Sequence, residues 1–121
     1  MKKLIVIAAL LLAPLTLIAG TWNGTIYQLI PTGTKATVTG STFTLDFPYD
    51  KHTWCTTIAG ASSVSVTFQG SLDNSLWVTL DTSTSASSEC RHVVNKPVKY
   101  VRAAVGTLDA GTIKVQSLHM N

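Results

Sequence analysis

Residues 62–80, SSVSVTFQGSLDNSLWVTL, decide the fold. In the first half, apolar side chains alternate with hydroxyl side chains, the period of two that places one face of a strand in a core. The apolar positions of this alternation are Val64, Val66 and Phe68. Asp73 and Asn74 then interrupt the pattern, and both residue types bond nearby backbone and tolerate turn conformations. The stretch therefore predicts a hairpin, with Trp77 just beyond the turn and able to cover one end of the core.

Similar short runs recur along the rest of the chain, separated by turn-forming residues, and no window of a dozen residues after residue 20 shows helical spacing. These runs are residues 25–30, 35–40, 41–47, 52–59, 77–81, 90–94, 98–105 and 112–118. In the run 41–47 we expect Phe43, Leu45 and Phe47 on one face, with Pro48 ending the strand. About eight short strands predict an all-β fold, an antiparallel sandwich or barrel. Residues 82–89, TSTSASSE, offer little to bury and predict a mobile surface loop.

The first twenty residues differ from this pattern. Lys2 and Lys3 precede an apolar stretch, residues 4–18, that ends in the small residues Ala19 and Gly20. This is the layout of a secretory signal peptide. An uncleaved apolar helix is the alternative, although Pro14 interrupts the stretch and about 20 apolar residues are needed to cross a bilayer. We therefore expect residues 1–20 to be a signal peptide or a retained apolar helix, and residues 21–121 to be one domain.

Charge argues against a nucleic-acid partner. The formal net charge of the 121-residue chain is +3, and removal of Lys2 and Lys3 with the leader would reduce it to +1. The remaining cations are spread among six acidic residues, with no basic block of the kind that binds phosphates. Contact with a membrane is expected only if the leader is retained.

Cys55 and Cys90 are the only cysteines. After export to an oxidising compartment, two cysteines are most simply interpreted as one disulfide. Two buried free thiols are the alternative if the leader is not a signal. A zinc site that also used His52 and His92 can be drawn, but the spacing lacks the usual pairs of close ligands.

The hairpin and two later segments resemble a known family. GSLDNSLWVTL (residues 70–80), KPVKYVRAAV (residues 96–105) and a last strand GTIKVQSL resemble the C-terminal half of the discoidin or galactose-binding-like jelly roll. The chain is similar, more narrowly, to small bacteriophage-encoded proteins, regarded as virion-associated, in which one such domain follows an apolar leader. The resemblance covers about residues 41–118.

The resemblance implies a jelly-roll sandwich and gives Asp73, Trp77 and Arg102 structural roles. It depends mainly on Ser71, Tyr100 and Val101 together with those three residues. The implied function is that of a non-enzymatic virion protein, such as a decoration, fibre or tail-associated subunit, acting through contacts with other virion proteins or by self-association into a homo-oligomer. The implied location is the virion, or the periplasm or medium if the leader is a signal.

Catalytic and cofactor motifs are not recognisable in the sequence. No G-x-S-x-G motif and no phosphate-binding glycine loop is present, and the histidines His52, His92 and His119 occupy contexts suited to strand ends or surface. We predict no enzyme activity, no cofactor and no metal, although Asp46 and Asp50 in a turn leave a calcium site open.

Aromatic residues offer an alternative function. Tyr49 and Trp54 flank a turn, and exposed aromatic rings stack on the apolar faces of sugars. A secreted module that binds cell-surface glycans through these two residues is therefore the second hypothesis. Trp54 can equally be a core residue, since it alternates with Cys55.

Overall fold

The computed structural model describes residues 25–120, which form nine β-strands and no helix. The strands are β1 (Tyr27–Thr34), β2 (Val38–Thr39), β3 (Phe43–Thr44), β4 (Lys51–Ala59), β5 (Val64–Ser71), β6 (Val78–Ser83), β7 (Glu89–Val93), β8 (Tyr100–Leu108) and β9 (Thr112–Met120). Within this part of the chain no helix is long and apolar enough to cross a membrane. The predicted leader, residues 1–20, lies outside the described residues.

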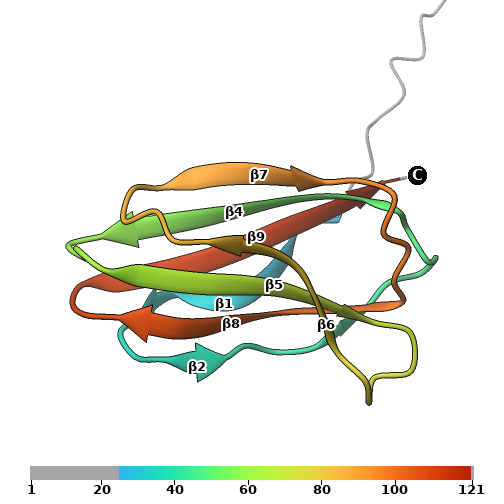
Figure 1. The fold of residues 1–121 in the computed structure, drawn as a ribbon, viewed down its shortest axis with the longest axis horizontal. Helices are drawn as coiled ribbons and strands as arrows, with labels where there is room; N and C mark the ends of the chain where they lie inside the picture. The colour runs from blue at the N-terminus through green and yellow to red at the C-terminus, as the bar shows by residue number, and fades with distance from the viewer. Residues whose placement is uncertain (1–24, 121) are drawn as a thin grey trace, which may run out of the picture.

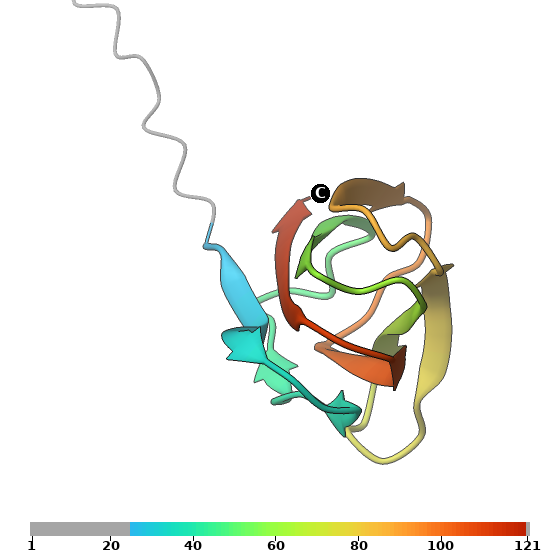
Figure 2. The same ribbon diagram turned by 90° about the vertical axis from the view of Figure 1, so that its left-hand side faces the viewer.

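The strands form two antiparallel sheets (Figure 1). One has the order β1-β9-β4-β7, and the other has the order β2-β8-β5-β6, with β3 also pairing with β8. Viewed along the strands, the sheets curl around a common interior (Figure 2). The predicted all-β antiparallel fold is confirmed.

The core follows the alternation in the sequence. Val64, Val66 and Phe68 of β5 are buried, as predicted, and so are Val101, Ala103 and Val105 on the neighbouring strand β8. Ile113 and Val115 of β9 and Trp54 of β4 complete the opposite layer. Burial of this apolar surface is the main force that holds the two sheets together.

Several predicted strand limits differ from the observed ones, and three of the differences have a clear place in the fold. The run 41–47 is a strand only at Phe43–Thr44; Leu45 is buried, but Phe47 is 61% exposed because the chain leaves the sheet before Pro48. In the run 35–40 only Val38–Thr39 is a strand. Strand β1 runs through Pro31 to Thr34 instead of ending before it. A proline is tolerated there because β1 is an edge strand, and its register with β9 shifts on either side of Ile30.

Candidate functional site

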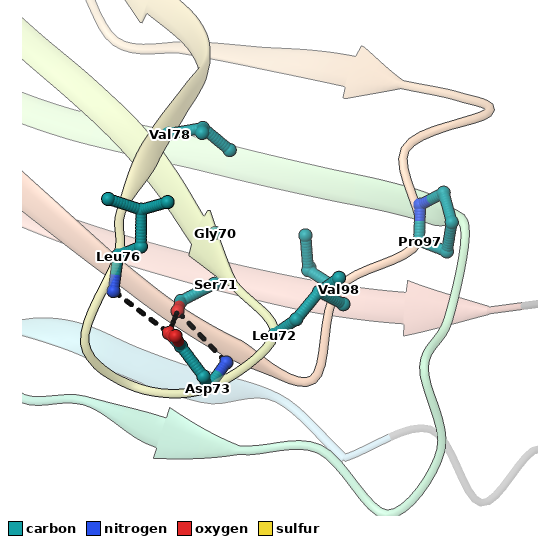
Figure 3. A pocket seen from close by; sticks show the side chains of 8 residues that line it. All are labelled: Gly70, Ser71, Leu72, Asp73, Leu76, Val78, Pro97 and Val98. Atoms are coloured by element: carbon teal, nitrogen blue, oxygen red, sulfur yellow. Dashed lines mark hydrogen bonds between the residues drawn. The ribbon is translucent and has the colours of Figure 1, made fainter.

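A pocket lies at the end of the sandwich where the β5–β6 hairpin meets the connection between β7 and β8 (Figure 3). It has a volume of about 310 Å³, which is at the small end of the range for ligand sites. Its lining is mostly apolar and consists of Gly70, Ser71, Leu72, Asp73, Leu76, Val78, Pro97 and Val98.

The polar side chains of this pocket are engaged in the hairpin itself. Ser71 Oγ donates to Asp73 Oδ1 at 3.0 Å, and the same carboxylate oxygen accepts from the backbone N–H of Leu76 at 2.8 Å (Figure 3). The backbone N–H of Ser75 donates to this oxygen as well, also at 2.8 Å. These backbone bonds, with that of Leu76 first, lower the pKa of Asp73. Asn74, next in the turn, has a positive φ of 61°, a conformation that asparagine adopts more readily than most residues do. Asp73 is therefore a turn-forming residue, as the sequence predicts.

The connections β3–β4, β5–β6 and β7–β8 meet at this end of the sandwich, on the right in Figure 1. Backbone bonds join them: Lys99 N–H donates to Ser71 O at 2.9 Å, and Val98 N–H donates to Tyr49 O at 3.2 Å. Several large apolar side chains on or beside these connections are exposed, and they are Phe47, Leu72, Leu76, Val78 and Val94. We call this set the apolar end. Leu72, Leu76 and Val78 also share the lining of the pocket, and contiguous exposed apolar patches mark contact surfaces more often than isolated apolar residues do.

Trp77 and Arg102 lie together outside the core. The Arg102 guanidinium carbon is 4.0 Å from the centre of the Trp77 ring, and Arg102 Nε donates to Gln69 Oε1 at 2.8 Å. The prediction that Trp77 covers an end of the core is wrong, because its half-buried ring serves instead as a platform for the cation. Within the described residues Arg102 forms no ion pair with an acidic side chain.

Trp54 cannot offer its ring to a sugar in this structure. Its exposed fraction is 0%, its ring stacks on Phe68 with 5.7 Å between centroids, and its indole Nε1 donates to Asp81 Oδ2 at 3.0 Å. Successive side chains of a strand point to opposite faces, so Trp54 points into the core and its neighbour Cys55 points outward. Tyr49, the other predicted sugar contact, is half-buried and packs edge-on against the exposed ring of Phe47 at 6.0 Å.

Cys55 and Cys90 form a disulfide. The two residues stand directly opposite each other on β4 and β7, and their Cα atoms are 4.0 Å apart. The bond joins an edge strand to its neighbour on the outer face of the sheet and uses both cysteines. A zinc site built on free thiols is thereby removed.

Among the described residues, no three His, Cys, Asp or Glu side chains lie close enough together to hold a metal ion. Asp46 is exposed, and Asp50 forms an ion pair with Lys51 at 3.8 Å.

A pair of buried histidines is the feature that the sequence did not reveal. His52 on β4 stands opposite His119 on β9, and their Nδ1 atoms are 2.7 Å apart. Both lie near strand ends, as predicted, but their exposed fractions are 2% and 7%, so the predicted surface placement is wrong for both. Burial is the largest cause that lowers the pKa of each, and the neighbouring imidazole helps to bring that of His119 to about 3. The alternation of side chains along each strand could have predicted that both histidines point into the core. Their contact with each other could not be predicted, because it depends on the register between β4 and β9.

Comparison with known proteins identifies the fold. No protein-family model and no curated protein matches the sequence. Among solved structures, the SPBc2 prophage-derived protein YomS superposes with a TM-score of 0.65, over 82% of this chain and 94% of that one, at 11% sequence identity. At that identity the likeness shows the fold alone. The chain thus has the fold of a prophage-derived protein, and a relationship to the discoidin family is not confirmed.

Proposed function

We propose that this chain is a non-enzymatic structural subunit of a bacteriophage particle, acting through contacts with other virion proteins or with copies of itself. The observation that carries the proposal is the apolar end. There Leu72 and Leu76 are 69% and 76% exposed, while the polar side chains beside them, Ser71 and Asp73, are occupied within the hairpin. Such a surface is suited to packing against another protein rather than to chemistry on a substrate.

The fold supports the same proposal. If β2 and β3, which both pair with β8, are counted as one interrupted strand, each sheet has four strands, a count that supports the expected jelly roll. The likeness to the prophage-derived YomS favours a phage origin. The disulfide is typical of proteins that fold in an oxidising compartment, and export through the predicted leader would bring the chain to one.

The proposal is tested by incorporation into particles. We expect the wild-type chain to copurify with phage particles, and Leu72→Asp with Leu76→Asp to remain soluble and folded yet absent from them, since a buried charge at a contact is costly. Val38→Asp on β2 is the matched control, because Val38 is an exposed apolar residue outside the apolar end. Normal incorporation of the double variant would contradict the contact surface, and absence of the wild-type chain from particles would contradict the function.

A second function, glycan binding, retains one supporting observation. The exposed Phe47 ring beside Tyr49 presents an aromatic surface at the same end of the sandwich. A glycan array tests it: specific binding that is lost in Phe47→Ala and kept in a conservative core variant, Trp54→Phe, would favour a carbohydrate-binding module. Silence across the array would leave the structural proposal.

A further inference from the structure

The hydrogen bonds of the buried histidines fix the position of every proton when both rings are neutral. His52 Nε2 lies 2.9 Å from the backbone oxygen of Lys96 and must donate, because a carbonyl only accepts. His52 Nδ1 is then the acceptor of the 2.7 Å contact, so His119 donates from its own Nδ1. This leaves His119 Nε2 to accept from the hydroxyl of Ser117 at 2.9 Å. The result is a one-way chain from Ser117 through both rings to Lys96.

This chain joins parts of the molecule that are distant in sequence. Ser117 and His119 belong to the end of β9, His52 belongs to the start of β4, and Lys96 belongs to the connection between β7 and β8. The next residues of that connection, Pro97 and Val98, line the pocket at the apolar end. We propose that the His52–His119 pair is an acid-sensitive fastener that holds this connection and the end of β9 in place, and that releases them when the pair is protonated.

The surroundings offer little to stabilise a charged imidazole. Aromatic carbon packs on the pair, with the Phe68 ring 5.8 Å from His52 and 6.3 Å from His119. The Tyr27 ring of β1 lies 5.4 Å from His119. Asp50, beside β4, favours a charge on His52 but makes no hydrogen bond to it. The ammonium of Lys96 points elsewhere and donates to Leu80 O.

Acid acts on the pair in two steps. One added proton can be accepted at His119 Nε2 if the Ser117 hydroxyl turns, but it places a charge in an apolar interior. A second proton would go to His52 Nδ1, where two N–H groups would then face each other across 2.7 Å. Neither step is favourable in the closed structure, so protonation is coupled to opening.

The sign of the pH effect follows from the lowered pKa values. The unfolded or opened state binds more protons than the closed state below about pH 6.5, so the closed state is fully favoured above that pH and weakens as the pH falls. For one site that remains neutral down to a pKa of about 3, the unfolding constant rises by about a hundredfold between about pH 7.5 and 4.5. Carboxylates with a lowered pKa act mainly below this window.

Denaturant unfolding at several pH values tests the fastener, with His119→Leu as the variant and His92→Gln as its matched control. His92 is the third histidine and is exposed on β7, where its Nδ1 contacts Thr53 Oγ1. Between about pH 7.5 and 4.5 we expect the unfolding constant of the wild type and of His92→Gln to rise about a hundredfold, and that of His119→Leu to rise much less. Equal pH dependence in His119→Leu and the wild type would overturn the proposal.

A second measurement needs no variant. Nitrogen chemical shifts of the wild-type imidazoles report tautomer and charge, and we expect His52 protonated at Nε2 and His119 at Nδ1, both neutral at about pH 6. When the pH is lowered, the protection factors of the backbone amides, which correct for the slower intrinsic exchange in acid, should fall first at Lys96, Val98 and residues 117–120. Identical tautomers, a charged ring at that pH, or unchanged protection in these two segments would each contradict the fastener.

Discussion

Trp54 and Asp81 connect the two sheets through a single hydrogen bond. Trp54 lies on β4 of one sheet, and its indole nitrogen donates across the interior to Oδ2 of Asp81 on β6 of the other. Arg91 on β7 donates to both oxygens of the same carboxylate, at 2.7 and 3.1 Å. Burial raises the pKa of Asp81, but the bonds from Arg91, Trp54 and the Thr82 amide outweigh it and lower the pKa overall. One carboxylate thus fastens the side of the sandwich where edge strands β6 and β7 meet.

Replacement of Asp81 tests this connection. Asp81→Ala leaves the buried indole N–H without a partner, and we expect a loss of about 1 to 3 kcal/mol in the free energy of unfolding. Asp81→Asn keeps an acceptor and should lose less. Urea unfolding near neutral pH measures both, with Asp50→Asn as control because the Asp50–Lys51 pair is exposed and worth little. Equal stability of Asp81→Ala and the wild type would show that the bond is not needed.

Gly70 marks the place where strand β5 closely approaches the connection between β7 and β8. A Cβ atom at this position would lie 2.5 Å from Val98 Cγ1 and 2.9 Å from Leu80 Cδ1. Leu80 can move, but the stiff Val98 cannot easily do so. We therefore expect Gly70→Ala to lose about 1 to 3 kcal/mol through overpacking. Thermal unfolding measures the loss, and Gly70→Ala with Val98→Ala should recover part of it; no loss in the single variant would refute the close approach.

The disulfide should contribute through the chain that it closes. Cys55 and Cys90 are 35 residues apart, and the chain-entropy estimate gives about 3 to 4 kcal/mol for such a loop. Cys55→Ser with Cys90→Ser should fall in stability by that amount in denaturant titrations. A reducing agent should have a comparable effect on the wild type and none on the double variant. A reductant-insensitive wild type with free thiols would mean that the bond does not form.

Asp73 should matter for the hairpin and not for binding. Asp73→Ala removes the acceptor of two backbone bonds and of the Ser71 hydroxyl, so we expect a lower melting temperature and faster amide exchange at Ser75 and Leu76. Asp73→Asn, which keeps one oxygen acceptor, should restore most of the protection. If the amides exchange at the wild-type rate in Asp73→Ala, the carboxylate does not hold the turn.

The fold was largely accessible from the sequence because alternation is a local property. The strand through Val66 and Phe68 and the turn at Asp73 required only neighbouring residues. The contacts of Trp54 with Asp81 and of His52 with His119 join strands far apart in the chain, so they depend on sheet order and register, which composition does not encode locally. The predicted position of Trp77 is wrong for the same reason: its outward direction depends on the contact with Arg102, which lies on another strand.

Intact-mass spectrometry of the chain recovered from purified phage particles tests the central proposal most directly. We predict that the chain is found in many copies per particle, with two hydrogens fewer than the reduced sequence because of the Cys55–Cys90 bond, and that the same mass shows whether residues 1–20 are removed. Abundance in the producing cells or medium with none in the particles would contradict the structural role.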